Sequence, residues 1–242
     1  MIGYAFALLI GLTLGLLGGG GSILTVPILV YLMKMEPKLA IALSLAIVGS
    51  TSLIGVIRHA KVKNVDFKVA FIFGPVAMIG TLAGAKISQL LTGEIQLLFF
   101  GIIMLLASVF MFKGQPTKEE DKSKSIKYPL LMTQAILVGI ITGIVGVGGG
   151  FLIVPALVLL ANISMKRAVG TSLLIISLNS ISGFIGYIGI VEIPWSFLFK
   201  FIAFSSIGII IGSYLSDYVP QQKLKKIFAV FLICVGGFIV TR

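Results

Sequence analysis

The stretch GLTLGLLGGGGSILTVPILV, residues 11–30, decides the fold of this chain, because four consecutive glycines interrupt an apolar helix within it. Glycine weakens a helix and permits positive φ, so we expect the helix to break at Gly18–Ser22 and a new one to start at Ser22–Ile23. At 1.5 Å per residue, the resumed piece, Ile23–Met33, is too short to cross about 30 Å of hydrocarbon. The stretch therefore predicts either a re-entrant hairpin or a kinked span.

The same pattern recurs in the second half of the chain as GIITGIVGVGGGFLIVPALV, residues 139–158, so that Gly139 is equivalent to Gly11. Its break is Gly146-Val147-Gly148-Gly149-Gly150, and a second short piece, Phe151–Ala161, follows it. The same offset in numbering continues to align glycines and polar residues as far as Gly84 and Gly212. A repeat sustained over this length indicates two structural units. We expect repeats at residues 1–112 and 129–242, joined by a polar cytoplasmic linker at 113–128.

The composition places both repeats in a membrane. The chain is 58% hydrophobic and 11% charged, with a mean hydropathy of +1.15, whereas soluble domains are about 45–50% apolar and about 25% charged. Each half carries three further apolar runs near the length of a membrane span. These runs are Leu39–Ile57, Val69–Leu91, Ile95–Phe112, Ala168–Ile190, Phe197–Leu215 and Ile227–Val240. We expect an all-α polytopic membrane protein in which each repeat has a glycine-broken, re-entrant helix pair and three transmembrane helices.

The basic residues predict how the halves are oriented, because basic loops stay on the cytoplasmic side. If the broken pair adds no net crossing, the halves are inverted, both termini lie outside, and 14 of the 19 basic residues lie inside. If the pair is one kinked span, the halves are parallel and only 11 lie inside. The count favours inverted repeats, an arrangement in which many transporters build a midplane site. The net charge of +11 therefore belongs to cytoplasmic loops, and we expect no nucleic-acid partner.

The two breaks are the predicted substrate site. The start of a short helix offers unpaired N–H groups and a positive dipole end that suit an anion, and neighbouring hydroxyl and amide groups can donate to one. No carboxylate falls near the centre of an apolar run, which favours an anionic substrate over a cation. The alternative is that glycines only let helices pack closely and polar groups only join helices. The candidate substrate contacts are Gly18, Gly19, Gly20, Gly21, Ser22, Thr51, Gly146, Gly148, Gly149, Gly150, Thr171, Ser172 and Asn179.

The two glycine-proline stretches and the sequence AVGTSLLIISLNSISGFIGY, residues 168–187, resemble the TauE/SafE-type permeases, a family of sulfite and organosulfonate exporters. The resemblance covers both halves. It implies a multi-pass plasma-membrane permease for sulfur oxyanions or small sulfonates, with Pro27 and Pro155 also near the path. One departure is that Gly170-Thr171-Ser172-Leu173 corresponds to Ala42-Leu43-Ser44-Leu45 in the first half, so we expect an asymmetric site.

We therefore expect a transporter for a small anion such as sulfite, working by alternating access in the lipid bilayer of the cell membrane. A passive anion channel or a non-transporting membrane subunit is the alternative. An intramembrane serine hydrolase is disfavoured, because His59 is expected in a solvated basic loop, far from Ser22 near the midplane. We expect no enzyme activity, no metal and no cofactor. The anion, the direction of transport, the coupling ion and the oligomeric state stay open.

Overall fold

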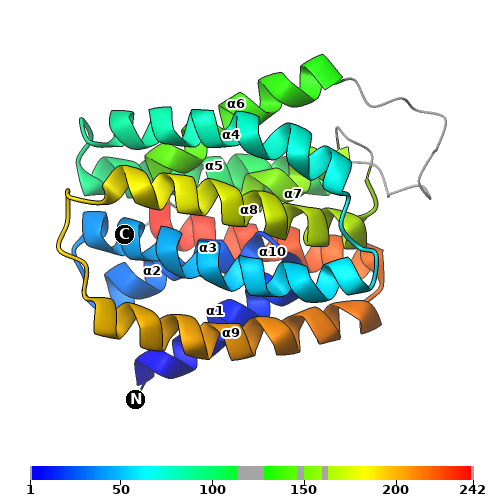
Figure 1. Cartoon of the computed structure of the whole chain (residues 1–242), viewed down its shortest axis with the longest axis horizontal. Coiled ribbons are helices and arrows are strands. Elements are labelled where there is room, and N and C mark those ends of the chain that lie inside the picture. The colour runs from blue at the N-terminus through cyan, green and yellow to red at the C-terminus, as the bar shows by residue number, and fades with distance from the viewer. Residues whose placement is uncertain (1, 114–127, 146–149, 160–162, 241–242) are drawn as a thin grey trace.

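The computed structural model describes residues 2–113, 128–145, 150–159 and 163–240 (Figure 1). Within these ranges the chain folds into helices and contains no strand, so the prediction of an all-α protein is confirmed. The first half contains α1 (Ile2–Leu17), α2 (Gly20–Pro27), the π-helix η1 (Ile28–Leu32), α3 (Pro37–Lys61), α4 (Phe67–Ser88) and α5 (Gly93–Lys113). The second half contains α6 (Tyr128–Val145), α7 (Gly150–Leu159), α8 (Met165–Tyr187), α9 (Trp195–Tyr218) and α10 (Gln221–Val240).

Four of the described helices, α3, α4, α8 and α9, are long and apolar enough to cross a membrane. The third predicted span of each half corresponds to α5 and α10, which have 21 and 20 residues. Of the most apolar 18-residue stretch of each helix, 78% is buried inside the protein in α3 and 72% in α8, against 44% in α4 and 39% in α9. Helices α3 and α8 therefore form the centre of the bundle, while α4 and α9 expose apolar side chains such as Phe71 and Phe199 at its periphery.

Helix α1 and the segment after it form a hairpin, which resolves the choice that the sequence left open. A Cβ atom on Gly3, at the start of α1, would lie 3.1 Å from Cε of Met33, at the end of η1. A Cβ on Gly21 would lie 2.5 Å from the carbonyl oxygen of Ile10. Late residues of the segment thus lie beside early residues of α1, so the chain turns back at the first break.

The first helix of each half packs against a helix of the other half. Close glycine contacts join α1 to α9, and the same contacts join α6 to α4 at the equivalent positions of the repeat. A Cβ on Gly11 would meet the backbone of Ser205 in α9, and a Cβ on Gly139 would meet that of Ala77 in α4. Because glycine removes the side chain between two backbones, the helices approach closely there.

The equivalent helices α3 and α8 lie side by side and run in opposite directions. A Cβ on Gly55 of α3 would lie 3.2 Å from Leu173 of α8, and a Cβ on Gly183 of α8 would lie 3.2 Å from Leu45 of α3. The contact is reciprocal, because Gly183 and Leu173 are the repeat equivalents of Gly55 and Leu45. Helices α5 and α10 also contact each other. Inversion of the two halves across a bilayer stays a prediction.

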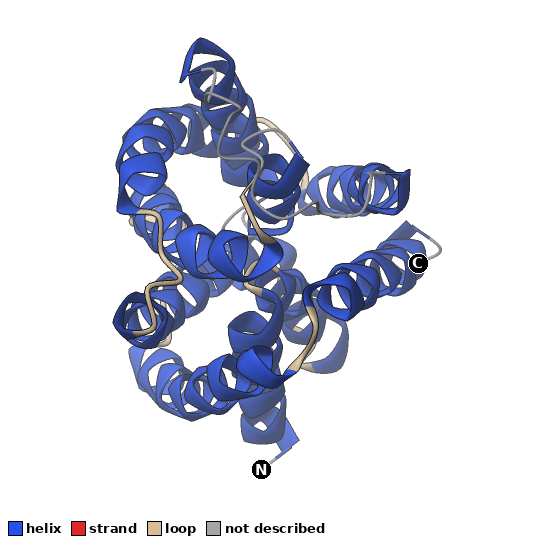
Figure 2. Ribbon diagram, turned by 90° about the vertical axis from the view of Figure 1, so that its right-hand side faces the viewer, coloured by secondary structure: helices blue, strands red, loops and turns tan. Residues whose placement is uncertain are grey.

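The two ends of the bundle differ in charge. At one end α3 and α9 finish while α4, α6 and α8 begin, and we call this the basic end (right-hand side of Figure 1). It carries Arg58, Lys61, Lys63, Lys166 and Arg167. In Figure 2 the basic end faces the viewer and many of the helices are seen nearly along their axes. The first residues of α3, α5 and α9 lie at the opposite end.

Candidate functional site

The first break is a sharp turn that lies against α8. Gly18 has a φ of +67°, in the left-handed region that glycine adopts without a steric penalty. A Cβ there would come within 2.7 Å of the Ser172 hydroxyl oxygen and 3.1 Å of the Val169 Cα atom. Two predicted site residues, Gly18 and Ser172, are thus brought together although they are far apart in the sequence.

The starts of the two short helices meet. Gly19 is the N-cap residue of α2, and Gly150 is the first residue of α7. A Cβ on Gly150 would lie 2.5 Å from the Cα atom of Gly19 and 2.5 Å from Cδ1 of Ile176 in α8. No side chain other than hydrogen fits between these backbones. The predicted site residues Gly146, Gly148 and Gly149 lie outside the described residues.

The first short helix starts two residues earlier than expected, at Gly20, so Gly20 and Gly21 belong to α2. Its N-cap residue provides no side-chain acceptor for the first N–H groups. The Ser22 hydroxyl donates to the Gly19 carbonyl oxygen at 2.6 Å and does not cap the helix. Neither α2 nor α7 has an acidic residue in its first turn. The positive ends of the two helices therefore lie close together without a carboxylate from either helix.

Two predicted site residues already have partners. The Thr51 hydroxyl, on α3, is hydrogen-bonded to the Ser205 hydroxyl of α9 at 2.7 Å. The Thr171 hydroxyl, on α8, accepts a hydrogen bond from the backbone N–H of Asp66 at 2.8 Å. Both bonds join the two halves of the chain. No pattern in the sequence indicates Ser205 or Asp66 as partners, because only the fold determines which segments become neighbours.

Asn179 is the predicted site residue with the most unused hydrogen-bonding capacity. It is fully buried on α8, and among the described residues neither its amide nitrogen nor its amide oxygen has a partner. Its equivalent in the first half is Thr51, but the position equivalent to Ser205 is Ala77, which has no hydroxyl. Three buried serine hydroxyls also lack a hydrogen-bond partner among the described residues, those of Ser44 and Ser52 on α3 and of Ser180 on α8. Ser172 differs, because its hydroxyl donates to the Val169 carbonyl oxygen at 2.8 Å.

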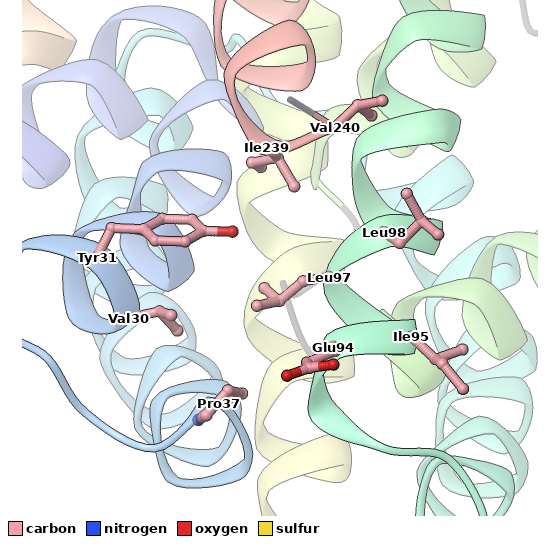
Figure 3. Close-up of a pocket in the computed structure, with 9 residues that line it drawn as sticks. All are labelled: Val30, Tyr31, Pro37, Glu94, Ile95, Leu97, Leu98, Ile239 and Val240. Carbon is pink, nitrogen blue, oxygen red and sulfur yellow. The ribbon is translucent and has the colours of Figure 1, made fainter. Parts of the chain in front are cut away.

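A cavity of about 600 Å³ lies apart from these residues, at the end opposite the basic end. Residues of η1, α5 and α10 line it, together with Pro37 at the start of α3. Figure 3 shows Tyr31 reaching into it from one wall, with Leu97, Leu98 and Glu94 on the wall formed by α5. Its lining is mainly apolar, and the acidic side chain in it, Glu94, would repel an anion. The cavity therefore does not contain the candidate site.

The expectation that His59 is solvated is wrong. His59 is 1% exposed, because its Cβ packs against Gly170 of α8. The sequence places this histidine beside Arg58 in a basic segment, and that neighbourhood suggested exposure. The helix end is covered by a residue from the other half of the chain, which no local pattern reveals.

The comparisons with known proteins agree with a transporter. The family described as "Sulfite exporter TauE/SafE" matches residues 4–239. A "Probable membrane transporter protein" of Xylella fastidiosa is 32% identical over 97% of this chain and 92% of its own length. The "Probable membrane transporter protein YdhB" of Bacillus subtilis is 28% identical over 93% of this chain and 92% of its own.

Another relative, the "Probable membrane transporter protein MJ0441" of Methanocaldococcus jannaschii, is 28% identical over 95% of this chain and 91% of its own. No solved structure matches the chain. The family match covers almost the whole sequence, and these relatives are aligned over most of their length. The chain is a membrane protein that belongs to the sulfite exporter TauE/SafE family, a family of membrane transporters.

Proposed function

We propose that this protein carries a small anion, a sulfur oxyanion or an organosulfonate such as sulfite, across the cell membrane by alternating access. The contact between Gly19 and Gly150 carries the proposal. Two positive helix ends that lie close together repel, and an anion beside them offsets that repulsion. Neither glycine has a side chain, so a small oxyanion can approach the backbone N–H groups directly.

The polar side chains of the candidate site have different roles in the proposal. Ser22 and Ser172 lie next to the first break and are hydroxyls that can turn toward a substrate. Asn179 supplies an amide donor that is already desolvated and unpaired. Thr51 and Thr171 are engaged with Ser205 and Asp66, so they position the helices that carry the site. All of these groups are neutral, and neutral donors bind an oxyanion while still allowing it to leave.

The two halves would provide the two states of the carrier. The antiparallel contact between α3 and α8, together with the packing of α1 on α9 and of α6 on α4, supports inverted repeats at residues 1–112 and 129–242. In an inverted pair, one half rocks against the other around a fixed site. The site between the halves then opens to alternate sides of the membrane.

The test is transport by purified protein in liposomes. Sulfite, sulfate and methanesulfonate are each placed inside, and their release is compared with that of chloride and with protein-free liposomes. We expect saturable release of at least one sulfur anion, accelerated by the same anion outside. Release that rises linearly with concentration and shows no counterflow would indicate a channel. No release of any of these anions, with no thermal stabilisation by any of them, would contradict the proposal.

A further inference from the structure

An ion pair joins the two halves at the basic end. The Arg58 guanidinium of α3 pairs with the carboxylate of Asp217, at the end of α9. The same guanidinium donates to the Ser213 carbonyl oxygen at 2.6 Å and lies 3.9 Å from the centre of the Tyr214 ring. The Arg58 side chain is 15% exposed. Several contacts thus hold the Arg58 side chain of the first half against the last turns of α9.

A second ion pair joins the halves, and here the cation comes from the second half and the carboxylate from the first. Arg167, in the first turn of α8, pairs with Asp66 at 2.9 Å, just before α4. The Thr171 hydroxyl accepts from the Asp66 N–H, and the neighbouring Lys166 donates to the Asp217 carbonyl oxygen at 2.8 Å. Arg58 and Asp217 therefore connect α3 to α9, while Arg167 and Asp66 connect α8 to the α3–α4 connection. The two pairs lie at the same end of the bundle.

The opposite end has no equivalent of either pair. The repeat equivalents of Arg58 and Asp217 are Gly186 and Gln89, and those of Asp66 and Arg167 are Pro194 and Leu39. None of these four equivalents is charged. There the halves are joined by a neutral bond of 2.6 Å between the hydroxyls of Tyr187 and Ser88. The two equivalent halves are thus joined by ion pairs at the basic end and by a hydrogen bond between two hydroxyls at the opposite end.

The basic end lies next to the first break. Val169 and Ser172, which lie against Gly18, come two and five residues after Arg167 near the start of α8. The two ion pairs therefore hold helix ends together on the basic side of the first break. We propose that the Arg58–Asp217 and Arg167–Asp66 pairs form a gate that closes the basic end, and that transport requires both pairs to separate. The gate rests on the alternating-access part of the proposed function.

Thiol labelling tests the gate without any substrate. Cys234 is the only cysteine of the chain, so C234S gives a cysteine-free background. Val169→Cys places a reporter behind the gate, where the side chain is 1% exposed. Ile41→Cys, the equivalent position in the first half, is similarly buried and reports on the opposite end. A polar maleimide is applied to purified protein in detergent, where both ends of the bundle can be reached.

We expect Asp217→Asn and Asp66→Asn each to accelerate labelling at Val169→Cys by about tenfold, and not at Ile41→Cys, because a partner of a partly buried charge pair is lost. Lys61→Gln removes a charge of the basic end that is in neither pair, and it should change neither rate. The exchange Arg58→Asp with Asp217→Arg should restore slow labelling.

Unchanged labelling at Val169→Cys in both neutralised variants would overturn the gate. Equal acceleration at both reporters would overturn it as well, because it would show general loosening. If either neutralised variant does not fold, the other variant and the charge exchange decide. A working gate in a protein that moves none of the sulfur anions would refute the proposed substrate and leave the gate standing.

Discussion

Gly19 and Gly150 touch backbone to backbone, although they belong to opposite halves of the chain, and each lies at the start of a short helix. The contact is possible only because Gly150 lacks a side chain. It brings two helix dipoles of the same sign together, which costs free energy without a counter-ion. We therefore expect this arrangement to stabilise an anion in a low-dielectric medium.

The first prediction concerns this contact. Gly150→Ala should lower anion transport by about tenfold or more, because the added methyl pushes Gly19 and Ile176 away and overpacking costs about 1–3 kcal/mol. Release from liposomes measures the effect. Gly237→Ala on α10 is the matched control, since a Cβ there has no heavy atom within 4 Å. Equal transport by both variants would contradict a site at the contact.

The second prediction separates the cost of backbone conformation from the cost of contact at Gly18. Gly18→Ala should destabilise the protein by more than Gly189→Ala. Both residues have positive φ, at 67° and 85°, and an alanine there costs about 1–2 kcal/mol. Only at Gly18 would the new Cβ also meet the Ser172 hydroxyl and Val169, whereas Gly189 faces open space. Thermal unfolding in detergent compares the two, and equal losses would show that Ser172 moves aside freely.

The third prediction concerns Asn179. Asn179→Leu should raise the thermal stability of the protein, because removing a buried amide without partners relieves about 1–3 kcal/mol. The same variant should lose the stabilisation that the substrate anion confers on the unmodified chain. Thr51→Val, at the equivalent position, is the control, and it should lower stability because Thr51 is bonded to Ser205. Full anion stabilisation of Asn179→Leu would remove Asn179 from the site.

The fourth prediction concerns Thr171. Thr171→Val should lower stability by about 1–3 kcal/mol, because the backbone N–H of Asp66 loses its acceptor. Thr171→Ser keeps the hydroxyl and should restore most of the loss. Thermal unfolding of the three proteins measures both effects. A valine variant with unchanged stability but weakened anion binding would instead make Thr171 a substrate ligand.

Much of the fold was predictable because local sequence controls local structure. Composition and run length indicated a helical membrane protein, and glycine clusters marked where the helices break. The repeat identified which helices are equivalent, since α3 and α8, α4 and α9, and α5 and α10 each begin at equivalent positions. These properties depend on backbone freedom and on the hydrophobic length of a segment, and both can be evaluated from consecutive residues.

The sequence by itself determined the class of protein, the equivalence of its helices and the position of the first break. Only the tertiary structure decided that the first break is a hairpin, that α1 packs on α9 of the other half, and that His59 is buried. It also paired Arg58 with Asp217 and Arg167 with Asp66. Apolar helices with small residues can pack with many partners, so their neighbours follow from the sum of distant contacts and cannot be derived from any single segment.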